Sequence, residues 1–265
     1  MDSFWQKQSS TKPLFPDIAW NKPEQRSRAG KLAVIGGNKL GFIAVSDAYN
    51  TASGLGAGQV RAILPDVLKR AVPASITDTY FIPSNVSGGF SRDAIPEIIA
   101  AANWADVCLL IGDMGRNSET AMALERLLDT YAGHLVVTRD AVELYKPVAE
   151  QLVQRHHTTL VMSFAQLQKL FQSVYYPKIL SFSMQLMQLV EALHKFTITY
   201  PASVVTFHQN QLIVAHNGEV VTQEFAEPMA IWRGVTAARA ACYLLWSPTT
   251  PLEAVATSFT EETLA

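Results

Sequence analysis

The chain has 265 residues, of which 49% are hydrophobic and 17% charged, and its formal net charge is −2. This balance predicts a large buried core and argues against a nucleic-acid-binding protein, which needs a concentrated basic patch. No window reaches the roughly 18 apolar residues of a membrane span, and the N-terminal residues lack the apolar segment of a secretory signal. Because Cys108 and Cys242 fall in apolar segments without metal-ligand spacing, we expect buried thiols in a cytoplasmic protein with no membrane partner.

Residues 1–30 are polar and contain proline, with Trp5, Phe15 and Trp20 at irregular spacing. We expect an arm that lies on the body of the fold or on a neighbouring subunit. The body then alternates short apolar runs that end in glycine or a turn with amphipathic or small-residue runs. This pattern predicts strands at 32–37, 59–64, 76–82, 106–112, 134–140 and 158–163, and helices at 44–55, 91–103, 118–132 and 164–171. We expect Ser91 to cap the start of helix 91–103 and Gly133 to cap the end of helix 118–132.

The last third of the chain changes pattern. Its longest predicted helix covers 178–196, and strands at 203–208 and 211–216 form a hairpin through Gln209-Asn210. A further strand follows at 219–225, and a last helix at 230–246. Together these elements predict one α/β domain, 1–265, with a doubly wound, mostly parallel sheet, an antiparallel edge and helices on both faces.

Glycines follow two of the predicted strands and precede helices. They occur in GGN, 36–38, and in GDMGR, 112–116. Ligands collect at the carboxyl ends of parallel strands, where helix N-termini offer free N–H groups. These glycines could instead serve close packing of helix and sheet. Arg116 could contact a phosphate, or its side chain could simply be solvated. The later GLGAG, 54–58, follows a helix instead of a strand and is therefore not a dinucleotide fingerprint.

Asp140 falls at the end of a third strand, within TRD, 138–140. It is placed to orient a substrate or bridge a metal, although an aspartate that opens a helix is more often an N-cap. His156 and His157 lie in a polar loop and are expected to be solvated. The sequence has no Ser/His/Asp order, zinc spacing or Walker motif that we recognise.

In their order along about 220 residues, these segments resemble the NAD(P)H-hydrate dehydratases of the ribokinase-like superfamily. GKLAVIGG and the residues after it resemble the family's opening strand and Ala-rich helix. Ala44 occupies the position of the alanine in the family's "GA" step. DVCLLIGDMGR resembles the "IGPGLGR" loop, and HLVVTRDAVEL resembles the "VLDADAL" strand. The segments that carry the resemblance are 30–60, 106–116, 134–144, 159–170 and 203–220.

The resemblance implies an enzyme that uses ADP or ATP, with Mg²⁺, to phosphorylate a hydrated nicotinamide cofactor and eliminate the phosphate. That chemistry needs an aspartate base in a "GTGD" turn, whose N–H groups hold the transferring phosphate. This sequence departs from the pattern there, because residues 228–238 contain no aspartate and only Gly234. The "HPGE" turn is SFAQ at 163–166, Phe207-His208 replaces the family's "KG", and Thr138 replaces an aspartate. Bulky Trp232 and Arg233 are expected at the nucleotide side of the cleft and could fill it.

Three functions remain open. The first is a degenerate member that keeps the fold and a binding pocket in a structural, binding or regulatory role. The second is a divergent active dehydratase or small-molecule kinase, and the third is unrelated ligand binding on the same sheet. For a retained pocket, the candidate substrate-binding residues are Asn38, Ala44, Gly112, Gly115 and Asp140. The ligand would be a nicotinamide or adenine nucleotide, and the resemblance implies a homo-oligomer.

Overall fold

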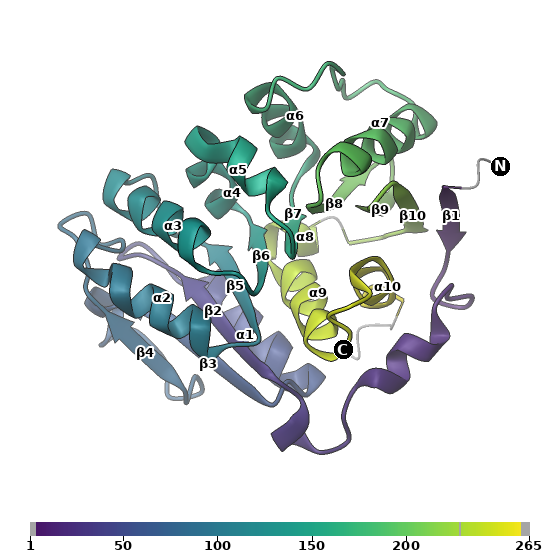
Figure 1. The fold of residues 1–265 in the computed structure, drawn as a ribbon. Coiled ribbons are helices and arrows are strands. Elements are labelled where there is room, and N and C mark those ends of the chain that lie inside the picture. The colour runs from purple at the N-terminus through teal and green to yellow at the C-terminus, as the bar shows by residue number, and fades with distance from the viewer. Residues whose placement is uncertain (1–3, 228, 261–265) are drawn as a thin grey trace.

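One twisted sheet organises the molecule in a computed structural model that describes residues 4–227 and 229–260 (Figure 1). Its ten strands lie in the order β1-β10-β9-β8-β7-β6-β5-β2-β3-β4. The strands are β1 (Trp5–Gln8), β2 (Lys31–Gly36), β3 (Gln59–Pro65), β4 (Thr79–Ile82), β5 (Val107–Gly112), β6 (His134–Thr138), β7 (Thr158–Val161), β8 (Ser203–His208), β9 (Gln211–His216) and β10 (Glu219–Glu224).

The strand directions confirm the predicted doubly wound, mostly parallel sheet. β9 is antiparallel to both of its neighbours, whereas every other pair in the described sheet is parallel. From β2 the chain adds β3 and β4 on one side, and from β5 it adds β6, β7 and β8 on the other. The order therefore reverses between β2 and β5, which is the point where open α/β sheets usually bind ligands.

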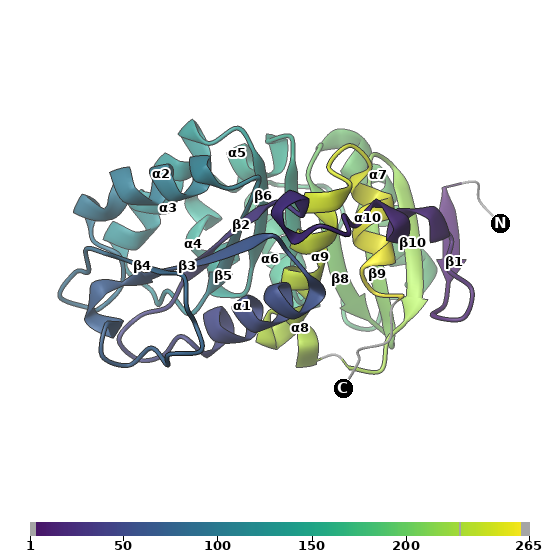
Figure 2. The same cartoon turned by 90° about the horizontal axis from the view of Figure 1, so that it is seen from below.

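Helices cover both faces of the sheet (Figures 1 and 2). One face carries α1 (Ile43–Leu55), α8 (Met229–Arg233), α9 (Val235–Trp246) and α10 (Pro251–Thr257). The other carries α2 (Ile95–Trp104), α3 (Ser118–Thr130), α4 (Asp140–Leu144), α5 (Ala149–Gln154), α6 (Phe164–Ser173) and α7 (Leu186–Thr199). Short 3₁₀ helices occur at Pro16–Asn21, Arg26–Arg28, Asp66–Leu68, Arg92–Ala94 and Lys146–Val148. None of the described helices is long and apolar enough to cross a membrane.

The two faces have separate cores because side chains along a strand alternate. In β2, Leu32 and Val34 pack under α1 and α9, whereas Ala33 and Ile35 pack under α2 and the helices beside it. All four residues are fully buried. Burial on both faces explains why the strands are continuous apolar runs rather than alternating ones.

Several boundaries differ from the predicted ones. Residues 178–185 are not helical, and α7 begins only at Leu186. The predicted helix 230–246 is two helices separated by Gly234, whose φ of 83° breaks the helical path, and α10 follows as an additional helix. Ser91 makes no side-chain cap, and α3 ends at Thr130 without using Gly133.

The N-terminal arm lies on the body of its own chain. Its residues 5–8 form β1, which pairs in parallel with β10 and was not predicted as a strand. The Trp5 indole N–H donates to Thr222 Oγ1 at 3.0 Å, and the Gln8 amide donates to the Ala256 carbonyl at 2.9 Å. In contrast, the side chain of Trp20 is 85% exposed.

Candidate functional site at the switch point

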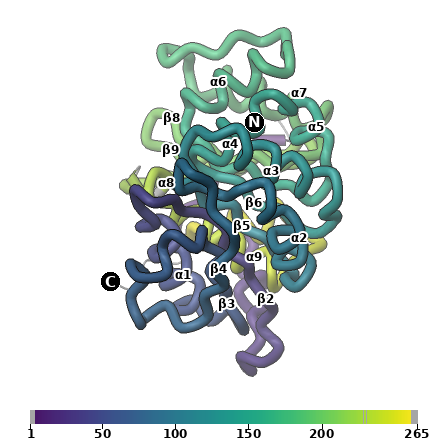
Figure 3. Tube along the Cα trace, turned by 90° about the vertical axis from the view of Figure 1, so that its left-hand side faces the viewer, coloured from purple at the N-terminus to yellow at the C-terminus, as the bar shows by residue number. Residues whose placement is uncertain are grey.

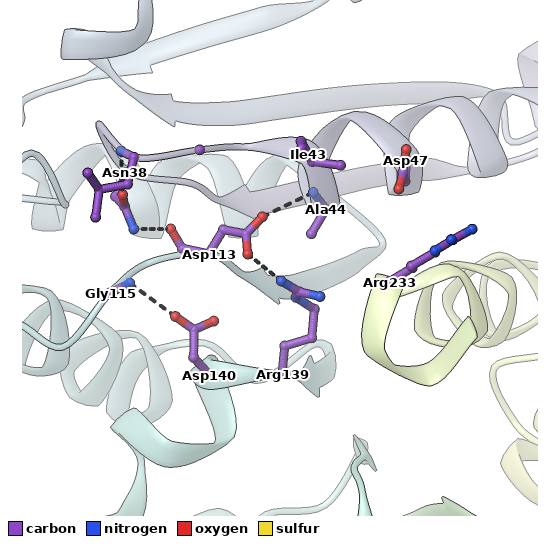
Figure 4. A pocket seen from close by; sticks show the side chains of 11 residues that line it. Asn38, Ile43, Ala44, Asp47, Asp113, Gly115, Arg139, Asp140 and Arg233 are labelled. Carbon is purple, nitrogen blue, oxygen red and sulfur yellow. Dashed lines mark hydrogen bonds and ion pairs between the residues drawn. The ribbon is translucent and has the colours of Figure 1, made fainter. Parts of the chain in front are cut away.

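A cleft of about 480 Å³ lies where the strand order reverses. Loops after β2, β5 and β6 form its floor, the start of α1 forms one wall, and the end of α8 forms another (Figure 4). In the tube view from the β4 side of the sheet, α1 lies on one side of the strands, and α2 and α3 lie on the other (Figure 3). The residues that line the cleft are Asn38, Leu40, Gly41, Ile43, Ala44, Asp47, Asp113, Gly115, Arg139, Asp140 and Arg233.

Asp113 connects three of the segments around the cleft. It follows β5 directly and has a φ of 57°, which an aspartate adopts more readily than most residues. Its carboxylate accepts the backbone N–H of Ala44 at 3.1 Å and also accepts the guanidinium of Arg139. The Asn38 amide donates to its carbonyl oxygen at 2.5 Å. The loops after β2, β5 and β6 are thus joined at a single residue.

Arg139 reaches Asp113 from an unusual backbone conformation, with a φ of 55° and a ψ of −137°. A non-glycine residue there costs on the order of 1–3 kcal/mol, so surrounding contacts must hold it in place. The Gln166 side chain provides one such contact by donating to the Arg139 carbonyl at 2.7 Å. The Arg139 and Asp113 side chains are 24% and 22% exposed, so their opposite charges pair in a partly desolvated position.

Asp140 holds the loop after β5 against the loop after β6. One of its carboxylate oxygens accepts the backbone N–H groups of Met114 and Gly115, both at 3.0 Å. Its other oxygen is buried and has no partner in the described part of the chain. The expectation that Asp140 is an N-cap is wrong, because it is the first residue inside α4 and Arg139 occupies the cap position.

Glycines allow the backbones of β2 and β5 to approach each other beneath the cleft. The Gly37 N–H donates to the Gly112 carbonyl at 2.9 Å, and a Cβ on Gly36 would lie 2.4 Å from that same carbonyl oxygen. Gly112 has a φ of 93°, where a side chain would meet Asp140. The packing interpretation of these glycines therefore holds at Gly36 and Gly112.

Comparison with known proteins identifies the fold. No protein-family model matches the chain, and no curated protein sequence is significantly similar to it. A ribokinase-like superfamily protein from Enterococcus faecalis matches at 15% identity with a TM-score of 0.73, covering 98% of this chain and 87% of that one. The fold is ribokinase-like.

Two functionally described proteins also have similar structures. The ADP/ATP-dependent NAD(P)H-hydrate dehydratase from Bacillus subtilis, co-crystallized with ATP and Mg²⁺ and soaked with CoA, matches at 13% identity. Its TM-score is 0.62, with 93% of this chain and 85% of that chain covered. A hydroxyethylthiazole kinase from Pyrococcus horikoshii has 10% identity and a TM-score of 0.58, covering 92% and 80%. At these identities the likeness establishes the fold alone.

The resemblance predicts a nucleotide side of the cleft in the segment where α8 meets α9. Arg233 lines the cleft there, while Trp232 lines a neighbouring aromatic pocket of about 370 Å³ with Phe164 and Phe182. Both Trp232 and Arg233 are exposed, and the cleft beside Arg233 is open. The expectation that these side chains fill it is therefore not met. The sequence from 228 to 252 contains no carboxylate. The first turn of α9 therefore offers N–H groups without an acidic side chain.

The structure brings together four of the five predicted site residues. Asn38, Ala44, Gly115 and Asp140 line the cleft, and Gly112 lies directly behind Asp140. Arg116 is exposed and lies outside the cleft lining, in agreement with its solvated alternative. Sequence reasoning missed Asp113, Arg139 and Asp47 as lining residues. For Asp113 and Arg139 a signal existed, because each directly follows the last residue of a buried strand.

Proposed function

We propose that the protein is an NAD(P)H-hydrate dehydratase-like pseudoenzyme that binds a nicotinamide or adenine nucleotide without dehydrating or phosphorylating a substrate. The observation that carries the proposal is the state of the carboxylates in the cleft. Asp113 is neutralised by Arg139 and accepts the Ala44 N–H, and Asp140 accepts two backbone N–H groups. A general base must be free to accept a proton from the reacting group. These two carboxylates instead hold loops together.

The same cleft keeps features that suit a nucleotide. Arg233 lines it without an ion pair in the described residues, and the N-terminus of α9 follows directly after it. A guanidinium and free N–H groups are good partners for a phosphate. The adjoining pocket with Trp232 and Phe164 offers aromatic faces for a planar ring.

A metal held by the protein is not part of this proposal. Within residues 4–227 and 229–260, no group of three or more His, Cys, Asp or Glu side chains is arranged to hold a metal ion. The residues present therefore fit the phosphates of a nucleotide, and Mg²⁺ would arrive bound to those phosphates.

Two further parts of the proposal are cytoplasmic location, supported by the buried free thiols of Cys108 and Cys242, and a homo-oligomeric state.

One observation favours a divergent active enzyme as the second candidate. Asp47 of α1 lines the cleft opposite Arg233 (Figure 4), and its carboxylate makes no hydrogen bond or ion pair with the described residues. A free carboxylate facing a cation across a cleft could serve a small-molecule kinase or a relocated dehydratase site. Activity that disappears on replacing Asp47 with asparagine would establish this alternative.

Ligand binding is tested by filling the cleft from a position that tolerates a side chain. Gly41 lines the cleft, and a Cβ built on it has no heavy atom within 4 Å. We expect ADP, ATP, NADH or hydrated NADH at ten times its Kd to raise the melting temperature of the wild-type protein by about 3–5 °C. Gly41→Phe should abolish this shift because its ring occupies the cleft.

The matched control for the cleft-filling variant is Gly54→Phe. Gly54 is also open on its Cβ side but lies near the end of α1, outside the cleft lining. The control should keep the full ligand shift. The proposal fails if none of the four compounds shifts the melting temperature, or if both variants respond to the ligand as the wild type does.

The oligomeric state has its own test. Large apolar side chains remain exposed on α7 and on the arm, with Met187 51%, Ile198 63% and Trp20 85% exposed. Their burial between subunits predicts a sedimentation coefficient above that of a 29.1 kDa monomer at micromolar concentration. A purely monomeric species at that concentration would remove the oligomer from the proposal.

A further inference from the structure

A second cavity, of about 530 Å³, lies at the opposite edge of the sheet from the switch-point cleft. Its walls are the amino ends of β6, β7 and β8, the carboxyl end of β9, and the loop between α9 and α10. Four of the six histidines of the chain line this one cavity. The lining residues that the argument uses are His134, His156, His157, Thr159, Ser203 and His216.

Arg155 fixes the loop that carries two of these histidines. Its guanidinium donates to the carbonyl oxygens of Tyr131 and Gly133, both at 2.6 Å, and to that of His157 at 3.2 Å. It also donates to Thr158 Oγ1 at 2.9 Å. The start of β7 is thus anchored to the start of β6 by one side chain. The cavity wall is consequently a built structure, although His156 and His157 are exposed as predicted.

Hydroxyl groups lie among the imidazoles. Ser203 Oγ and His216 Nδ1 are 2.9 Å apart and share a hydrogen bond. Thr159 is only 2% exposed and lines the cavity, yet its hydroxyl makes no hydrogen bond with the described residues. A hydroxyl that lines a cavity and has no protein partner is available to a ligand as donor or acceptor. The cavity wall therefore carries imidazole and hydroxyl groups that can hydrogen bond to a polar ligand.

The charge around the cavity favours an anion. No aspartate or glutamate is among its lining residues, and Glu253, two residues after lining residue Pro251, is not one of them. Arg155 acts electrostatically on His134, and the Tyr131 hydroxyl donates to the His134 carbonyl. Tyr131 is in turn influenced by Cys108 of β5 and by Asp106 just before that strand. No set of three or more metal-binding side chains is arranged to hold a metal in the described chain. The cluster is thus unsuited to a cation.

We propose that this histidine-lined cavity binds the phosphate group of a small molecule, independently of the switch-point cleft. A phosphate has three strong acceptor oxygens, which suit the imidazole and hydroxyl donors that line the cavity. The cavity is far larger than one phosphate, and Pro201, Pro248 and Pro251 give it an apolar wall for the rest of the molecule. A phosphate monoester fits this combination better than a free inorganic ion.

Binding should become tighter as the pH falls. Burial, together with electrostatic interactions with His157 and Arg155, lowers the pKa of His134 to about 4. Burial and the interaction with His157 also lower the pKa of His216. Both imidazoles are therefore neutral near pH 7. A bound dianion favours the imidazolium form and raises these pKa values, so binding takes up protons. Affinity then increases as the pH falls through the raised pKa values.

The experiment measures binding of glycerol phosphate, inorganic phosphate and malonate by isothermal titration calorimetry between pH 7.5 and 5.5. Sulfate is included because its charge stays constant over this range, whereas phosphate itself titrates. We expect saturable binding of glycerol phosphate, weaker binding of inorganic phosphate, and a sulfate affinity that rises at least about fivefold toward pH 5.5. Proton uptake should appear as a dependence of the binding enthalpy on the buffer.

The variants are His134→Asn and His157→Asn. His157 has a φ of 55°, a conformation that asparagine also tolerates, so this change should leave the backbone in place. Each variant should weaken glycerol phosphate binding by about tenfold, since one hydrogen bond to a charged group is lost. The control is His208→Gln, because His208 bonds the Met184 carbonyl at the other edge of the sheet.

Four results would overturn the proposal. They are malonate binding as tightly as glycerol phosphate, no saturable binding up to about ten millimolar, no change in the two variants, and an equal loss in His208→Gln. Because the cleft-filling Gly41→Phe variant leaves this cavity intact, it should bind glycerol phosphate normally. A failure here therefore leaves the proposed function of the switch-point cleft untouched, and the reverse also holds.

Discussion

Incubated with ATP or ADP, Mg²⁺ and hydrated NADH, the purified protein is expected to regenerate no NADH above the spontaneous background. Loss of a catalytic base and of the groups that hold a transferring phosphate lowers rates by several orders of magnitude. The sequence from 228 to 252, which includes the start of α9, contains no aspartate or glutamate. Asp113 and Asp140, which line the same cleft, are engaged by Arg139 and by backbone N–H groups.

The measurement is the rise in NADH absorbance, with an active dehydratase in parallel to show that the substrate is intact. A turnover on the order of one per second, which is ordinary for an enzyme, would contradict the expectation. The Asp47→Asn variant then identifies the source. Loss of that turnover in the variant would assign the activity to the free carboxylate of α1, whereas retention would point to a contaminating enzyme.

Replacing Gly112 with alanine is expected to lower the free energy of unfolding by about 3–5 kcal/mol. Its φ of 93° is unfavourable for alanine by roughly 1–2 kcal/mol. The new Cβ would also meet an Asp140 carboxylate oxygen at 2.3 Å and the Arg139 Cβ at 2.9 Å. Asp140 would have to move, and its hydrogen bonds to the N–H groups of Met114 and Gly115 would be lost.

Urea denaturation of Gly112→Ala beside Gly41→Ala checks this expectation. Gly41 lies in the same cleft but has no heavy atom within 4 Å of its Cβ position and no positive φ. Its alanine variant should therefore unfold within about 0.5 kcal/mol of the wild type. Equal midpoints for the two variants would show that the loops after β5 and β6 are not packed as the structure has them.

The sheet could be predicted because its strands are buried on both faces and so form apolar runs. LAVIG, VCLLIG and HLVVT need no tertiary information to be recognised. β1 could not, since three of its four residues, WQKQ, are polar and the segment is a strand only through its pairing with β10. Gly234 divides a run of helix formers with a φ of 83°, and a side chain at this position would meet Ile111.

The cleft was predictable as a place and less so as a set of contacts. In a parallel sheet the carboxyl ends of all strands lie at the same edge. Asn38, Gly115 and Asp140 each follow such an end and were therefore expected near one another. The pairing of Asp113 with Arg139 depends on two positive φ values that sequence does not reveal. The role of Asp140 depends on which backbone N–H groups the neighbouring loop turns toward it.

The pairing of β1 with β10 has a consequence for the order of events during protein synthesis. Gln8 and Gln223 hydrogen bond across a separation of 215 residues. At the ribosome's rate of about 5–20 residues per second, the arm waits roughly 10–40 s before its partner strand is made. During that time the parallel sheet from β2 to β8 can assemble without it. β1 thus leaves the ribosome before the other described strands but joins the sheet after them, where it covers the open edge of β10.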